Sequence, residues 1–101
     1  MIITGGEHVY PSEVEAVIST HPAVLDVAVI AVSDPKWGEA VKAVVVRKKG
    51  MEVTEREIID YCKDKMSGYK KPKSVDFIAE DEMPRTATGK ILHRKLRERY
   101  E

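Results

Sequence analysis

The sequence predicts a single α+β domain, in which a small three-stranded sheet is flanked by helices and preceded by a β-hairpin. Two apolar, β-branched runs, residues 24–32 and 41–47, are joined by a short turn, as in a pair of buried antiparallel strands. Residues 54–66 carry apolar side chains at helical spacing. Residues 1–10 contain a pair of glycines between extended segments, which is typical of a hairpin turn.

The composition fits one domain with a modest core. The chain has 101 residues, of which 43% are hydrophobic and 34% are charged. Cys62 is the only cysteine, so an intrachain disulfide or a cysteine-based zinc site is excluded and a reducing compartment is favoured. No stretch approaches the ~18 apolar residues of a membrane span, and no signal-peptide pattern is present. We therefore expect a cytoplasmic protein without a transmembrane segment.

The hairpin at the start would place residues 1–4 and 7–10 on its two strands. Gly5 and Gly6 would form the turn, because glycine adopts the positive φ angles that tight hairpin turns need. The chain thus begins inside a structural element, and we expect it to be a piece of something longer.

The first helix is predicted to follow directly. Ser12 and Glu15 fit a capping box. Val14, Val17 and Ile18 then lie on one face.

A second capping box opens the second helix. Thr54 and Glu57 have the required spacing. Ile58, Cys62 and Met66 follow at intervals of four residues, so residues 54–66 form an amphipathic helix whose apolar side includes the cysteine.

The last third contains a basic loop at residues 69–73, a third strand at residues 75–79 and a final helix over roughly residues 90–100. The segment PRTATGKILHRK (residues 84–95) joins the last two. It places Lys90 in the first helical turn, where a cation faces the positive end of the helix dipole and is slightly unfavourable. Stability does not explain this lysine, which leaves either a functional ammonium group or a solvated lysine of a basic helix.

The charge is unevenly distributed although its sum is zero. Residues 1–62 carry six basic and ten acidic side chains, and residues 63–101 carry eleven basic and seven acidic ones. A basic C-terminal third is suited to a polyanion such as nucleic acid, nucleotide phosphates or anionic lipid. A solvated lysine-rich surface fits the same charges.

Self-contained catalysis finds little support in the sequence. No Ser-His-Asp arrangement, paired carboxylate or metal-ligating cluster is evident, so we expect no metal site. Gly89 and Lys90 do not form a phosphate-binding P-loop, because Pro84 and Ile91 occupy positions where that motif has glycine and Ser or Thr.

Nucleotide contacts are the remaining candidates. Trp37, the only tryptophan, would stack on a base if its turn exposes it, or cap the core if not. Lys70, Lys71 and Lys73 surround a proline beside Tyr69, and they would meet phosphates or simply face solvent.

Three long stretches also match a known family. They are IITGGEHVYPSEVEAVI, HPAVLDVAVIAVSDPKWGEAVKAVVV and YKKPKSVDFIAEDEMPRTATGKILHRKLRE. In this order and spacing they resemble the C-terminal domain of AMP-forming acyl-CoA synthetases, within the adenylate-forming enzymes. The resemblance covers essentially the whole chain.

The resemblance implies a two-step reaction in a larger enzyme. A carboxylic acid, which we expect to be a fatty acid, would attack the α-phosphate of ATP to give acyl-adenylate, and CoA would then displace AMP. ATP, AMP, CoA and Mg²⁺ would bind to the full-length enzyme, whose N-terminal domain is the partner of residues 1–101. No nucleic acid is implied, and the fragment alone is expected to bind no cofactor and to be inactive.

The resemblance also assigns roles by position. Lys90 matches the lysine that enters the active site for adenylation, where its ammonium bridges the carboxylate and the α-phosphate. Gly5, Gly6 and Glu7 match the hairpin that lines the pantetheine channel in the second step.

Trp37, Tyr69, Lys71 and Lys73 match positions that contact the CoA nucleotide in related enzymes. His8 departs from the family, in which asparagine is common. The hinge residue, phosphate-binding loop and acyl pocket of the family are missing, which implies an excised domain.

Two other functions remain open. One is an adenylate-forming relative with a different acceptor, like luciferases or peptide synthetases. The other is a free-standing module that binds nucleotides or nucleic acid through its basic C-terminal third.

Overall fold

The structure, a computed structural model, describes residues 1–68 and 70–100. It contains five strands, three α-helices and a short 3₁₀ helix among those residues. In chain order they are β1 (Ile2–Thr4), β2 (Glu7–Val9), α1 (Pro11–Ile18), β3 (Val24–Asp34), β4 (Gly38–Arg47), α2 (Glu55–Lys63), β5 (Ser74–Phe77), η1 (Glu80–Glu82) and α3 (His93–Arg99).

The predicted α+β class is confirmed, but the sheet has five strands where the sequence predicts three. The order is β2-β1-β4-β3, and β5 pairs with β4 in parallel. The N-terminal hairpin joins the sheet through an antiparallel pairing of Thr4 with Gly38. Because only one residue of each strand takes part in this pairing, neither sequence shows that β1 lies beside β4. The sequence therefore predicts the hairpin as an element separate from the sheet.

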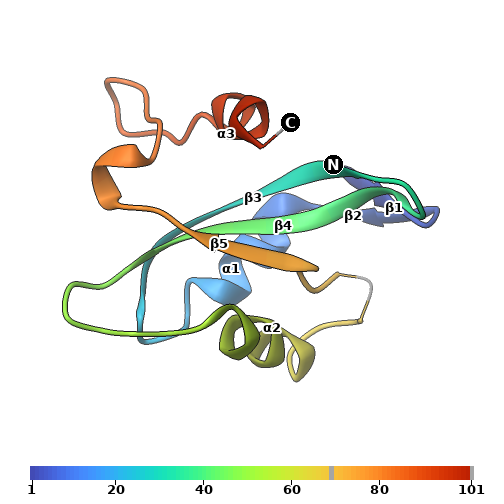
Figure 1. Cartoon of the computed structure of the whole chain (residues 1–101), viewed down its shortest axis with the longest axis horizontal. Coiled ribbons are helices and arrows are strands. Elements are labelled where there is room, and N and C mark those ends of the chain that lie inside the picture. The colour runs from blue at the N-terminus through green and yellow to red at the C-terminus, as the bar shows by residue number, and fades with distance from the viewer. Residues whose placement is uncertain (69, 101) are drawn as a thin grey trace.

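The sheet is covered on both faces. Figure 1 shows α1 and α2 on one side of β3 and β4 and α3 on the other. Val27 and Val29 belong to the cluster under α1 and α2, whereas Ala28 and Ile30 belong to the cluster under α3. Burial of alternate residues on opposite faces explains why β3 reads as a continuous apolar run.

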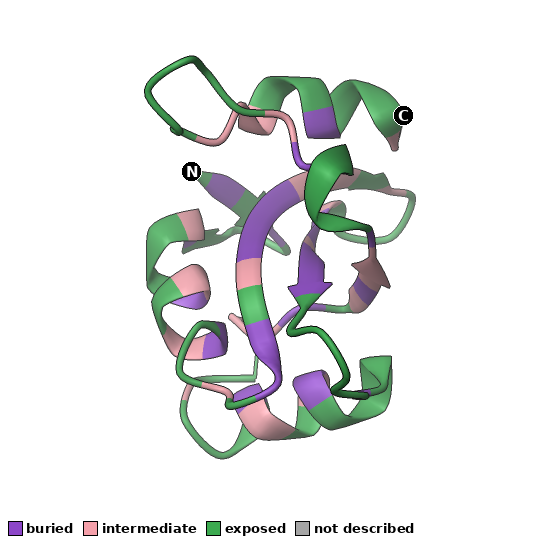
Figure 2. Cartoon of the chain, turned by 90° about the vertical axis from the view of Figure 1, so that its left-hand side faces the viewer, coloured by how far each residue is buried: buried purple, intermediate pink, exposed green. Residues whose placement is uncertain are grey.

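Burial follows the same layering. Figure 2 shows buried residues along the central strands and on the helix sides that face them, while the loop that precedes α3 is exposed. No helix of the described part of the chain is both long and apolar enough to span a lipid bilayer.

The start of α1 differs from the prediction. Tyr10 is the N-cap residue, and no side chain caps the helix, so the predicted capping box of Ser12 and Glu15 is wrong. The Glu15 carboxylate instead accepts a hydrogen bond from the Val29 amide at 2.8 Å and contacts His93 Nε2 at 2.6 Å. Glu15 therefore ties α1 to β3 and α3.

The second predicted capping box is confirmed. The Thr54 hydroxyl accepts from the Glu57 amide at 3.2 Å, and the Glu57 carboxylate accepts from the Thr54 amide at 3.2 Å. Helix α2 ends at Lys63, before the predicted end at residue 66. Cys62 is buried, and this burial raises the pKa of its thiol to about 11.

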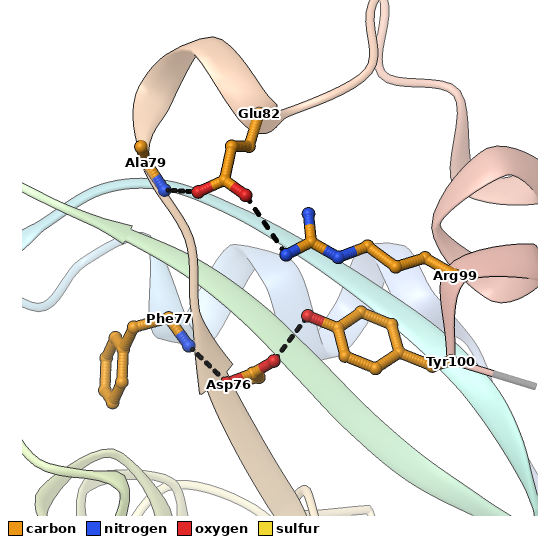
Figure 3. Close-up of polar contacts among 6 residues, drawn as sticks. All are labelled: Asp76, Phe77, Ala79, Glu82, Arg99 and Tyr100. Carbon is orange, nitrogen blue, oxygen red and sulfur yellow. Dashed lines mark hydrogen bonds and ion pairs between the residues drawn. The ribbon is translucent and has the colours of Figure 1, made fainter.

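The end of α3 is attached to β5 and η1 (Figure 3). The Tyr100 hydroxyl donates to Asp76 Oδ2 at 2.5 Å, and Arg99 Nη2 lies 3.1 Å from Glu82 Oε2. Burial, followed by the hydrogen bond to Asp76, raises the pKa of Tyr100 to about 12. The Ala79 amide and Arg99 both donate to Glu82 and lower the pKa of its carboxyl.

Candidate functional site

The glycine turn of the first hairpin packs against the tryptophan turn. Gly5 and Gly6 have φ angles of 56° and 84°, as the predicted hairpin requires. The Gly5 amide donates to the Trp37 carbonyl at 3.0 Å. A Cβ atom on Gly5 would lie 2.8 Å from Trp37 Cε3, so the indole can lie here only because residue 5 has no side chain.

Asp34 holds the tryptophan turn in shape. Its Oδ1 accepts hydrogen bonds from the Lys36 and Trp37 amides, both at 2.9 Å. The bond from the Trp37 amide, followed by that from the Lys36 amide, holds the pKa of the Asp34 carboxyl below its usual value. Trp37 remains 39% exposed, so of the two predicted alternatives the structure supports an accessible indole.

Lysines surround the indole. Lys36 Nζ lies 4.9 Å and Lys73 Nζ 5.1 Å from the centre of the Trp37 ring, which is within cation–π distance. Lys73 also lies 3.9 Å from Asp34 Oδ2, and its amide donates to the Val41 carbonyl at 2.8 Å. The basic loop is thereby fixed beside the tryptophan turn.

These elements enclose a pocket of about 320 Å³, which we call the indole pocket. It brings together most of the residues that the family resemblance assigns to the pantetheine channel and to CoA nucleotide binding. Gly6 belongs to the same turn without lining the pocket, and Tyr69 lies outside the described residues. The pocket is lined by Thr4, Gly5, Glu7, Trp37, Val41, Gly68, Lys71 and Lys73.

The indole pocket presents an aromatic ring, two lysines and bare backbone side by side. An accessible aromatic face can stack on a base, and Lys71 and Lys73 supply positive charge for phosphates. The bare backbone at Gly5 lets a narrow group approach closely. Its volume lies at the lower end of the range for small-molecule sites, which suits one part of an elongated ligand.

Lys90 lies in a different place from the predicted one. Helix α3 begins at His93, so Lys90 is outside the helix and the dipole argument does not apply to it. The reason is a second small hairpin, the lysine loop (residues 84–92), in which Arg85 pairs with Ile91. The Leu92 amide donates to the Pro84 carbonyl at 2.9 Å, and the helix can begin only after this bond.

The lysine loop is closed by its own polar groups. The Thr86 amide donates to the Lys90 carbonyl at 2.8 Å, and the Lys90 amide donates to Thr86 Oγ1 at 3.1 Å. Gly89 adopts a φ of 90° and donates its amide to the Thr86 carbonyl at 2.9 Å. The Lys90 side chain is exposed, and within residues 1–68 and 70–100 its ammonium has no hydrogen-bond or ion-pair partner.

The two candidate sites are far apart. In Figure 1 the β1–β2 hairpin lies at one end of the long axis, and the orange-red lysine loop before α3 lies towards the other. The structure therefore gathers five of the CoA candidates into the indole pocket, away from the lysine loop.

Some contacts had no signal in the sequence. Glu15 and His93 meet across 78 positions of the chain, and Arg85 pairs with Asp26. Such pairs form when elements distant in the sequence pack together, so the spacing of nearby residues cannot predict them. A hollow of about 410 Å³ beside Glu15 and His93 contains none of the predicted site residues. In the described part of the chain, no three His, Cys, Asp or Glu side chains are grouped to hold a metal ion.

Comparison with known sequences identifies the family. Residues 13–90 match the family described as AMP-binding enzyme C-terminal domain. A long-chain-fatty-acid–CoA ligase of Mycobacterium tuberculosis is 50% identical over 100 residues, which are 99% of this chain and 19% of that ligase. A 2-succinylbenzoate–CoA ligase of Bacillus cereus is 45% identical over 101 residues, which are 100% of this chain and 20% of that ligase. The chain thus spans about a fifth of these relatives.

Solved structures agree with this assignment. The Mycobacterium tuberculosis fatty acyl CoA synthetase has a TM-score of 0.91 at 50% identity, over 99% of this chain and 19% of that one. The o-succinylbenzoate CoA synthetase of Bacillus subtilis, in complex with an acyl-adenylate intermediate, has a TM-score of 0.85 at 41% identity, over 94% of this chain and 19% of that one. Because the family match covers most of the chain and the fold agrees, this chain belongs to the family of AMP-binding enzyme C-terminal domains.

Proposed function

We propose that residues 1–101 form the mobile C-terminal domain of an acyl-CoA ligase, which joins a carboxylic acid to CoA through an acyl-adenylate. The family match and the two ligases that contain a similar domain support this proposal. A fatty acid is the substrate class that we favour, since the long-chain-fatty-acid–CoA ligase is 50% identical. The N-terminal domain of the same ligase would hold the acid, ATP and Mg²⁺.

In the first step, Lys90 would supply a positive charge to the reacting groups. Its exposed ammonium, unpaired among the described residues, is free to bridge the carboxylate and the α-phosphate. A lysine suits this role because it is a compact charge on a long stem. It would orient the attack and stabilise charge that develops at phosphorus.

In the second step, the indole pocket would receive CoA. Trp37 would stack on the adenine, and Lys71 and Lys73 would face the phosphates. The turn of Gly5, Gly6 and Glu7 would line the passage for the pantetheine arm. Tyr69 belongs to this proposal by sequence position alone.

The observation that carries the proposal is the separation of the two groups of residues. Five of the CoA candidates come from three distant segments and line one pocket, whereas the lysine loop lies towards the other end of the domain (Figure 1). One rigid domain could present both groups to a single active site only by turning between the steps. This arrangement suits a two-step enzyme better than a simple nucleotide-binding module.

The CoA half of the proposal is tested by kinetics of the full-length ligase. We expect Trp37→Ala to raise the KM for CoA by about 5- to 150-fold, since stacking on a base contributes about 1–3 kcal/mol. Trp37→Phe should restore most of the affinity. Formation of acyl-adenylate should stay unchanged, and an unchanged KM for CoA would contradict the proposal.

Lysine variants give a matched control. Lys71→Gln should weaken CoA binding and make it less sensitive to salt, because a phosphate contact is lost. Lys48→Gln also removes one positive charge, but Lys48 follows the last residue of β4, at the end of the strand away from Trp37. This variant should change neither the affinity for CoA nor its dependence on salt. Equal effects of both variants would show that only the overall charge matters.

A further inference from the structure

Arg85 connects the lysine loop to the body of the domain. Its Nη1 donates to the Gly89 carbonyl at 2.9 Å, and its Nη2 pairs with Asp26 Oδ2. Asp26 belongs to β3 and is half-buried, with a side chain that is 22% exposed. One guanidinium therefore bridges the central sheet and the residue immediately before Lys90.

Apart from Arg85, the loop is held only at its base, where Ile91 is partly buried against the core cluster under α3. Residues 85–90 are all exposed, and no apolar side chain among them enters the core. The bonds between Thr86, Gly89 and Lys90 close the loop on itself and do not reach the sheet. A closed loop that is held only at its base can tilt about that base, and Arg85 supplies a second attachment, to the sheet.

The Asp26 carboxylate is oriented and partly buried where it pairs with Arg85. Its Oδ1 accepts a hydrogen bond from the Val27 amide at 2.9 Å, which orients the carboxylate. The strand register shifts between Val24 and Asp26, so the side chain projects where the regular ladder of β3 is interrupted. Its other oxygen is buried, and the guanidinium supplies the charge that a buried carboxylate oxygen requires.

We propose that Arg85 is a positioning residue for adenylation, which holds the lysine loop against Asp26 so that Lys90 points in a fixed direction from the domain. This inference rests on the proposed adenylation role of Lys90. Arg85 itself would contact no substrate. Catalysis depends steeply on such positioning, because a displacement of about 1 Å can cost on the order of 100-fold in rate.

The first test measures the loop itself, in the isotope-labelled chain, by backbone ¹⁵N relaxation. Arg85→Gln and Asp26→Asn should both increase the mobility of the Gly89 and Lys90 amides and leave those of β3 and β4 unchanged. Asparagine at position 26 keeps the acceptor for the Val27 amide, so only the ion pair is lost. Unchanged mobility of the loop amides would overturn the inference.

Arg56→Gln is the matched control. Arg56 pairs with Asp60 on the surface of α2 at 3.5 Å, so this variant also removes an arginine–carboxylate pair. It should leave the lysine loop unchanged. The melting temperature of each variant reports separately on folding.

The second test uses the two half-reactions of the full-length ligase. Arg85→Gln and Asp26→Asn should each lower the kcat of adenylation by between about 10- and 100-fold, with the KM for ATP and thioester formation from supplied acyl-adenylate unchanged. The double variant should be no worse than either single variant, because both remove the same bridge. Equal losses in both half-reactions, or additive losses, would overturn the positioning role.

Lys90→Ala separates this inference from the proposed function. If Lys90→Ala leaves the rate of adenylation unchanged, the proposed function is wrong, regardless of how mobile the lysine loop is in the other variants. If Lys90→Ala abolishes adenylation while Arg85→Gln and Asp26→Asn retain the full rate, the proposed function stands and the positioning role is wrong.

Discussion

At the scale of single residues, the contact between Gly5 and Trp37 shows how one missing side chain shapes a site. The indole occupies the space that a Cβ atom on residue 5 would need, at 2.8 Å from Cε3. The glycine is thus required twice, for its positive φ angle of 56° and for this space. A change here should alter stability and the indole pocket together.

We expect Gly5→Ala to destabilise the chain more than Gly6→Ala. Alanine at a positive φ angle costs about 1–2 kcal/mol at either position, and Gly6 has nothing within 4 Å of its would-be Cβ. Only at position 5 does overpacking against the Trp37 ring add a further ~1–3 kcal/mol. Urea unfolding of both variants checks this difference. Equal losses would mean that the ring moves aside freely.

Tyr100 gives a prediction for alkaline pH. Its pKa is raised from 10.0 to about 12 in the folded chain, so its contribution to stability is complete below pH 10 and is lost as the pH rises to about 12. The difference in unfolding free energy between wild type and Tyr100→Phe should therefore shrink over this interval. Denaturant unfolding at several pH values measures it. A difference that stays constant from pH 9 to pH 12 would contradict the role of the hydroxyl.

At the scale of elements, the two predicted capping boxes had different outcomes. Both have the same sequence pattern, but only Thr54 and Glu57 form the reciprocal bonds. Glu15 is instead drawn into a contact with Val29 and His93. A side chain whose spacing predicts a helix cap can thus form tertiary contacts and leave the helix end uncapped.

This difference can be measured. Thr54→Ala should cost about 1 kcal/mol, since a capping hydroxyl is lost. Ser12→Ala should stay within about 0.5 kcal/mol, as expected for an exposed side chain without such a role. Urea unfolding of the two variants provides the comparison. A loss at Ser12 equal to that at Thr54 would contradict the cap geometry described above.

The sequence predicted the elements better than their boundaries. The first hairpin, the strands β3 and β4 and the helix α2 follow from local patterns of glycines, β-branched residues and apolar spacing. The start of α3 could not be predicted, because no local pattern shows that the Leu92 amide bonds to the Pro84 carbonyl. The bridge from Arg85 to Asp26 likewise joins distant segments without a local signal.

At the scale of the whole molecule, the domain carries two separate groups of candidate residues. The five-stranded sheet connects the indole pocket with the lysine loop, and helices cover both of its faces (Figure 1). The sequence has no phosphate-binding P-loop motif, and the chain spans about a fifth of the ligases that it resembles. We therefore expect the chain alone to catalyse no ATP–pyrophosphate exchange, and exchange above background would contradict the assignment to one part of a larger ligase.

The central claim is that Lys90 serves adenylation and has no part in thioester formation. The most direct measurement compares both half-reactions of the full-length ligase with and without Lys90→Ala. We expect pyrophosphate exchange to fall on the order of 100- to 1,000-fold, as when a preorganised charge contact to a transition state is removed. Thioester formation from supplied acyl-adenylate and CoA should keep its rate. An equal loss in both half-reactions, or no loss in the first, would contradict the account.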